Sequence, residues 1–117
     1  MIDDGALQEV DAAIALHVWS DLPAGICYFR DGHSLASVDS FKAWIRGQGG
    51  HGAYPHLSRD PLFMLAPILT ALYAIPSRHI NPLRESVVSL GQIHGGTAPN
   101  IIPAKLFLEG TIRAYDP

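Results

Sequence analysis

The sequence predicts an α+β fold in which one helix covers one face of an antiparallel sheet. Three observations support this fold class. Residues 37–46 and 105–115 alternate apolar and polar side chains, which is the period of a half-buried strand. Residues 85–94 contain several β-branched side chains, which favour a strand. Residues 61–75 are apolar nearly throughout and follow an aspartate, which is typical of a helix.

The composition is that of a globular protein with a single core. The chain has 117 residues, 48% hydrophobic and 16% charged, with a net charge of −3. The charges are scattered, so we expect no nucleic-acid partner. No apolar run reaches membrane-spanning length and residues 1–4 lack signal-peptide chemistry, so we expect no membrane partner. The single cysteine, Cys27, cannot form an internal disulfide, which favours a cytoplasmic location.

The first 35 residues predict two short strands. Residues 12–18 form an apolar run that suits a buried strand, although a helical segment would show the same run. Residues 26–30 predict a second strand between two turns. We expect residues 1–35 to be a lead-in whose packing partners are absent from the chain.

The strands at 37–46 and 105–115 each have one apolar and one polar face. The side chains predicted to point inward are Phe41, Ala43 and Ile45 on the first strand and Leu106, Leu108, Ile112 and Ala114 on the last. The opposite face carries Ser40, Lys42, Trp44 and Arg46 on the first strand and Lys105, Glu109, Thr111 and Arg113 on the last.

The helix between them has clear boundary signals. Asp60 is the expected N-cap, Pro61 the first helical residue and Pro76 the end. Pro67 lies inside and should remove one backbone hydrogen bond. Because the helix is apolar nearly all round, we expect it to be sandwiched in its own domain or to meet another subunit.

The order strand, helix, strand, strand is the first part of a ferredoxin-like sandwich. The sandwich is incomplete, since a full unit adds one more helix and strand and the chain stops at residues 116–117. The edge of the first strand is then unpaired, and an open edge recruits partners. We therefore expect a homodimer or higher oligomer, formed by edge pairing and the apolar helix, unless residues 24–30 fill the edge.

The stretch GQGGHGAYPH (47–56) sets one histidine among four glycines. His51 at a strand exit can reach into a cleft, and the bare backbone lets a ligand approach closely. His56 follows, but two histidines without a carboxylate supply too few ligands for a catalytic zinc site. A flexible loop with incidental surface histidines explains the same residues equally well.

Three other residues are weaker candidates. Asn100 can aim its amide at a substrate carbonyl or carboxylate, or it can form an Asx turn. Arg113 can bind a carboxylate, although a solvated strand arginine is the commoner case. His17 can be a metal ligand, although a lone histidine after an apolar run is more often buried and hydrogen-bonded.

Four stretches together are more specific. ALHVWSDLPAG, GQGGHGAYPH, GGTAPNIIP and EGTIRAYDP, in this order and at these spacings, resemble the amidohydrolase branch of the aminoacylase-type metallopeptidases. That branch includes hippurate hydrolases, N-acyl-amino-acid amidohydrolases and indole-acetyl-amino-acid hydrolases. The resemblance covers nearly the whole chain.

The resemblance implies two domains and four site residues. Residues 1–35 would be the remnant of a catalytic domain that carries two metal ions, zinc or manganese, and residues 36–117 a lid and dimerisation domain lacking its last helix and strand. His17 matches a metal ligand. His51 matches the catalytic lid histidine that stabilises the oxyanion and that related dimers supply across the interface. Asn100 and Arg113 match substrate-binding residues.

The family's general-base glutamate and its other metal ligands have no counterpart in these 117 residues. One histidine cannot hold a hydrolytic metal centre, which needs three or more protein ligands. We therefore expect a chain that is inactive alone and serves as the lid and dimerisation part of a metal-dependent amidohydrolase of N-acyl amino acids. The alternative is a stand-alone, non-catalytic ferredoxin-like module that self-associates or binds a small carboxylate.

Overall fold

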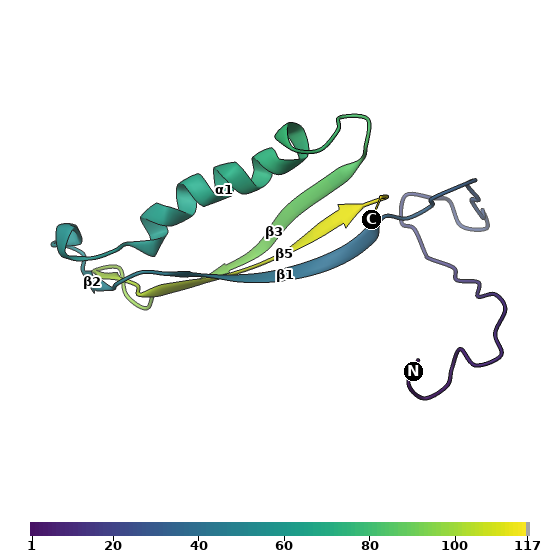
Figure 1. The fold of residues 1–117 in the computed structure, drawn as a ribbon, viewed down its shortest axis with the longest axis horizontal. Helices are drawn as coiled ribbons and strands as arrows, with labels where there is room; N and C mark the ends of the chain where they lie inside the picture. Colours follow the sequence, from purple (N-terminus) through teal and green to yellow (C-terminus); the bar gives the residue numbers. More distant parts are fainter. Residues whose placement is uncertain (117) are drawn as a thin grey trace.

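In the computed structural model, which describes residues 1–116, a three-stranded antiparallel sheet carries one long helix on one face (Figure 1). The predicted α+β class is confirmed, and Pro117, the last residue of the predicted second domain, lies outside the described residues. The elements in chain order are β1 (Ser37–Arg46), β2 (Gly50–His51), a 3-10 turn η1 (Pro55–Leu57), α1 (Pro61–Arg78), β3 (Ser86–His94), β4 (Ile101–Ile102) and β5 (Lys105–Ala114).

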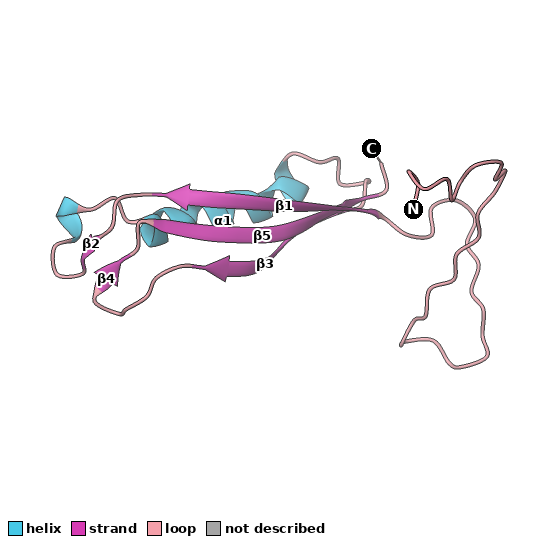
Figure 2. Cartoon of the chain, turned by 90° about the horizontal axis from the view of Figure 1, so that it is seen from below, coloured by secondary structure: helices cyan, strands magenta, loops and turns pink. Residues whose placement is uncertain are grey.

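The long strands lie in the order β1-β5-β3, with β5 in the centre and antiparallel to both neighbours (Figure 2). This is the arrangement of the first three strands of a ferredoxin-like sheet, in which the third strand inserts between the first two. Among residues 1–116, no strand pairs with the outer edge of β1 or of β3. Both edges therefore offer free backbone donors and acceptors to a partner strand.

The core lies between α1 and the sheet. Its buried residues are Ile45 on β1 with Leu106 and Leu108 on β5, against which Met64 and Leu65 of α1 pack. The inward faces predicted for β1 and β5 are therefore confirmed at these positions. Ile112 lies farther along the same face of β5, where it keeps 41% of its surface exposed.

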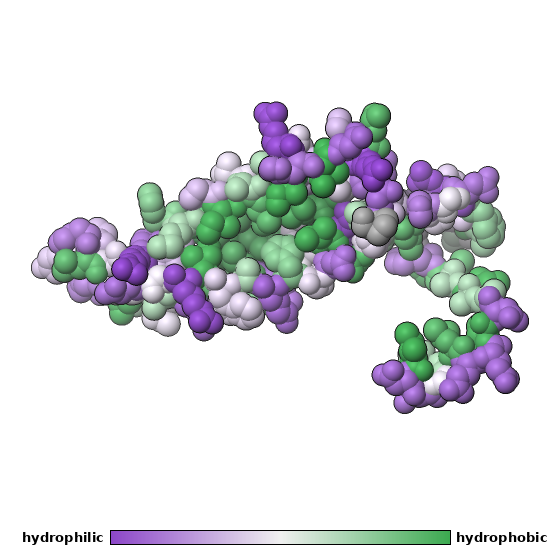
Figure 3. Space-filling model, in the orientation of Figure 1, coloured by the Kyte–Doolittle hydropathy of each residue, from purple (hydrophilic) through white to green (hydrophobic). Residues whose placement is uncertain are grey.

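One helix does not cover the apolar face of a three-stranded sheet. Hydrophobic residues gather over the middle of the molecule between α1 and the sheet, where Figure 3 shows them open to solvent. On α1 itself only Pro61 is buried, and Phe63 on its outer side is 80% exposed. Within residues 1–116 the helix is thus not sandwiched, and its outer face remains available to a partner.

The start of α1 follows the predicted capping chemistry. The Asp60 side chain accepts a hydrogen bond from the backbone N–H of Leu62 at 2.8 Å, and Pro61 occupies the first turn. The predicted end at Pro76 is wrong, since α1 continues to Arg78 and the N–H of His79 donates to the carbonyl of Ile75 at 2.9 Å. A proline already has a helical φ, and at this position it costs only one hydrogen bond of the last turns.

Because α1 continues beyond its predicted end, one expectation about membranes changes. At 18 residues, α1 is long and apolar enough to cross a membrane by length and composition, whereas the sequence predicted no run of that length. A mostly buried core helix of a soluble protein passes the same test, although only 6% of α1 is buried here. Met64 and Leu65 pack against the buried cluster, which is the arrangement expected of a helix layered on a sheet.

The N-terminal segment contains neither of its predicted strands. Residues 1–36 form turns and extended coil, and the apolar side chains of the run 12–18 are open to solvent, with Ile14 98% exposed. Residues 26–30 are also coil, and the segment 24–30 does not fill the open edge of β1. Strand composition alone was misleading because a strand also needs a neighbour for its backbone hydrogen bonds.

The same segment gives the molecule its extended shape. The radius of gyration is 21.1 Å, whereas a compact domain of this length has about 13 Å. Figure 1 shows why, since the purple N-terminal trace runs away from the end of the sheet where β5 finishes.

Candidate functional site

The two glycine- and proline-rich loops, predicted as separate loops, pair with each other beyond the end of the main sheet. Gly50 lies opposite Ile102 and His51 opposite Ile101, so that β2 and β4 form a two-residue antiparallel ladder. The N–H of Gly52 also donates to the carbonyl of Asn100 at 2.8 Å. His51 and Asn100, two of the predicted site residues, are therefore neighbours.

Close backbone contact explains the glycines around His51. A side chain on Gly49 would place its first carbon 2.8 Å from the carbonyl oxygen of Ile102 and 3.2 Å from the nitrogen of Ala104. Gly47 is more crowded still, because such a carbon would overlap the carbonyl oxygen of Arg59. Neither glycine has a positive φ, so close packing rather than an unusual backbone conformation requires glycine here.

His51 is exposed and has a defined hydrogen bond. Its Nδ1 accepts from the backbone N–H of Ala53 at 3.1 Å, and its ring lies 5.6 Å from that of Tyr54. Since Nδ1 is the acceptor, the neutral ring carries its proton on Nε2. This inferred tautomer leaves Nε2 as a hydrogen-bond donor for a ligand.

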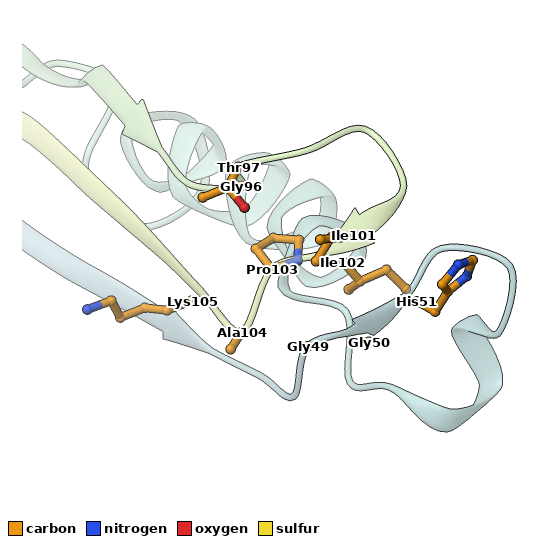
Figure 4. Close-up of a pocket in the computed structure, with 10 residues that line it drawn as sticks. All are labelled: Gly49, Gly50, His51, Gly96, Thr97, Ile101, Ile102, Pro103, Ala104 and Lys105. Carbon is orange, nitrogen blue, oxygen red and sulfur yellow. The ribbon is translucent and has the colours of Figure 1, made fainter.

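A shallow groove of about 590 Å³ runs from His51 to the start of the main sheet. Figure 4 shows His51 at one end and Lys105, the first residue of β5, at the other. Lys105 was placed on the outward face of its strand but not in the site. The only sequence signal that Lys105 lines this groove was its position directly after the Asn100 loop.

Arg113 is exposed at the opposite end of the sheet. It lies on β5 between Val38 of β1 and Val87 of β3, and it lines a second groove of about 600 Å³ together with Arg84 and Tyr115. Arg113 follows Lys105 by eight positions on β5, which corresponds to about 26 Å along an extended strand. The structure therefore brings His51 and Asn100 together and keeps Arg113 apart from them.

The other two histidines considered as site residues, His17 and His56, do not line this groove. His17 is exposed on the N-terminal coil, where its Nδ1 is 2.6 Å from the carbonyl oxygen of Val18 and its ring 5.4 Å from that of Trp19. His56 lies on η1 with its ring 6.2 Å from that of Tyr54. Across residues 1–116, no three His, Cys, Asp or Glu side chains come together as a metal site would require.

Comparison with known proteins links this geometry to a family. Residues 34–117 match the peptidase dimerisation domain family. The chain is 40% identical to the N-acetyl-L-cysteine deacetylase of Bacillus subtilis (strain 168), across 99% of the chain and 28% of that protein. It is 38% identical to the N-acyl-L-amino acid amidohydrolase of Geobacillus stearothermophilus, across 99% of the chain and 31% of that protein.

Solved structures show the same fold. A crystal structure from methicillin-resistant Staphylococcus aureus superposes with a TM-score of 0.80 at 32% identity, covering 97% of this chain and 30% of that one. The aminobenzoyl-glutamate utilization protein of Klebsiella pneumoniae gives 0.61 at 25% identity, covering 72% and 21%. The chain thus spans about a third or less of each of these proteins.

We predict that Gly49→Ala destabilises the paired loops. The added methyl group clashes with the backbone of β4, and overpacking of this kind costs about 1–3 kcal/mol. The matched control is Gly91→Ala in β3, where the nearest atom lies 3.9 Å from the added carbon. Urea unfolding of both variants measures the difference. Equal stabilities would show that close packing is not why glycine stands at position 49.

Proposed function

Because this chain belongs to the peptidase dimerisation domain family, we propose that it forms the lid and dimerisation part of an amidohydrolase that acts on N-acyl amino acids. The four stretches that resemble such enzymes support the proposal. So do two relatives whose names give N-acetyl-L-cysteine and N-acyl-L-amino acids as substrates. The family assignment confirms the resemblance seen in the sequence.

The observation that carries the proposal is the distance between the candidate residues. His51 and Asn100 lie beyond one end of β5 and Arg113 near the other, about 26 Å away along the strand. A substrate the size of a dipeptide spans about 7 Å. One protomer therefore cannot hold such a substrate with all three residues at once.

A twofold dimer removes this difficulty. If two sheets join edge to edge and antiparallel, the Arg113 end of one protomer lies beside the end of the other sheet that carries the partner's His51. The argument holds for pairing through β1 or through β3, since both strands are antiparallel to β5 and both have an open edge. The apolar outer side of α1 supplies further surface for association.

Each residue then has a role that fits its donors. Arg113 presents a planar guanidinium that binds a carboxylate through two parallel hydrogen bonds. The Nε2–H of His51 and the amide of Asn100 are donors of the kind that stabilise an oxyanion. Because these donors belong to a lid, they complete the site only when it closes over the substrate, and closure also excludes water.

The residues of this chain do not fit a complete metal site. A divalent ion, zinc or manganese, would activate water in the enzyme that we propose. His17 offers at most one ligand, and residues 1–116 contain no cluster of three. The ion's other ligands must come from outside these residues. We also keep the cytoplasm as the proposed location, on the basis of the single cysteine.

We predict that the 117-residue chain does not hydrolyse N-acyl amino acids when zinc or manganese is added, because it lacks the ligands for a hydrolytic centre. Release of free amino acid from N-acetyl-L-cysteine and N-benzoylglycine is the measurement. The control is the same assay with an active amidohydrolase. Steady turnover by the purified chain would contradict the proposal that the ligands of the catalytic metal lie outside these residues.

We predict that the chain is a dimer of about 25 kDa, twice its 12.6 kDa, and that Phe63→Lys weakens the dimer by placing a charge on the apolar side of α1. Light scattering after size exclusion measures both masses. The matched control is Ile14→Lys, which changes an even more exposed apolar residue on the N-terminal coil. A monomeric wild type would refute self-association, and equal effects of the two substitutions would exclude α1 from the interface.

A further inference from the structure

The helix-free face of the sheet, seen in Figure 2, carries a row of three aromatic side chains. Trp44 of β1 lies directly opposite Phe107 of β5, which in turn lies opposite His94 of β3. The ring centroids of Trp44 and Phe107 are 5.5 Å apart, and those of Phe107 and His94 are 6.1 Å apart with the planes stacked at 18°. The three rings form one continuous aromatic row across the sheet.

This aromatic row is open and ordered. Trp44 is 50% exposed and His94 is exposed, while Phe107 between them is half-buried. A hydrogen bond of 3.1 Å between Nε2 of His94 and the side-chain oxygen of Gln92 fixes the outer ring. Single exposed aromatic residues are common on protein surfaces, but a contiguous apolar patch marks a binding surface.

Charges on the two sides of the aromatic row differ. Toward the middle of the sheet, Lys42 and Glu109 neutralise each other in an ion pair of 3.5 Å. Toward the loops, Arg46 and Lys105 lie opposite each other, two residues from Trp44 and Phe107 on the same face. Neither cation has an ion-pair partner among residues 1–116. The row is therefore bordered on this side by two unneutralised positive charges.

We propose that the aromatic row is a binding site for a small aromatic carboxylate. The ligand ring packs against Phe107, the central ring of the row, with Trp44 and His94 beside it, and its carboxylate faces Arg46 and Lys105. The arrangement complements the ligand in aromatic character and in charge. Lys105 also lines the groove of His51, so the site borders that groove and lies about 20 Å along β5 from Arg113. It does not depend on the amidohydrolase function.

Tryptophan fluorescence tests this site in the whole 117-residue chain. The chain has two tryptophans, so a Trp19→Phe background leaves Trp44 as the sole reporter. Phenylacetate is the probe, acetate the control without a ring and benzylamine the control with the opposite charge. We expect a saturable change with phenylacetate alone. A similar response to acetate or to benzylamine would overturn the proposal.

Two variants locate the binding. His94→Ala removes one exposed ring from an edge strand and should weaken phenylacetate binding about three- to tenfold, the effect of one aromatic contact. Lys105→Gln should weaken it by a similar factor. Ser89→Ala, on the same face of β3, is the matched control and should leave binding unchanged. Circular dichroism confirms that each variant is folded.

Two outcomes would overturn the assignment without bearing on the lid proposal. If Ser89→Ala weakens binding as much as His94→Ala, the aromatic row is not the site. If a saturating concentration of phenylacetate leaves the emission of Trp44 unchanged, the aromatic row does not bind an aromatic carboxylate. The light-scattering mass is independent of both results, so failure here is distinguishable from failure of dimerisation.

Discussion

The arrangement of the candidate site depends on the close contact between the two glycine-rich loops. Backbone hydrogen bonds of 2.8 Å join Gly47 to Ala104 and Gly52 to Asn100, and the β2–β4 ladder lies between them. A side chain at Gly49 would force these backbones apart, and one at Gly47 would overlap the carbonyl oxygen of Arg59. The contact holds His51 beside Asn100 and extends both beyond the end of the main sheet.

The length of the sheet then determines what one protomer can do. β5 has ten residues and connects the His51 end with the Arg113 end in a single continuous strand. A strand of this kind cannot fold back to bring its two ends together. Within residues 1–116 the outer edges of β1 and β3 have no strand partner and the apolar helix is exposed to solvent. Together with membership of a dimerisation domain family, these features indicate association. On this view the dimer both stabilises the exposed apolar surfaces and completes the site.

The sequence predicted the three long strands and the helix, and it missed the short strands β2 and β4. Alternation located β1 and β5, β-branched residues located β3, and an Asp-Pro pair located the start of α1. A two-residue ladder such as β2–β4 has no period to detect. The run 12–18 had the composition of a buried strand, but no described strand pairs with it. The helix passed Pro76 because proline is compatible with helical φ.

Some features of the candidate site could also be predicted from the sequence, and others required the structure. His51 and Asn100 were noticed as members of unusual loops, but their proximity depends on a pairing between residues fifty positions apart. The distance to Arg113 follows from the register of β5 rather than from any motif. Lys105 and the aromatic row became visible only when the three strands were aligned, because each aromatic residue alone is ordinary on a strand.

Cross-linking between chains tests the central claim most directly. In a Cys27→Ser background, chains with His51→Cys are mixed with chains carrying Arg113→Cys and treated with a short bifunctional maleimide. We predict abundant linked heterodimers, because the antiparallel arrangement brings the two ends together. Chains that carry both substitutions should show no intramolecular link across about 26 Å. Equal linking in the mixture and in His51→Cys chains alone would contradict the account.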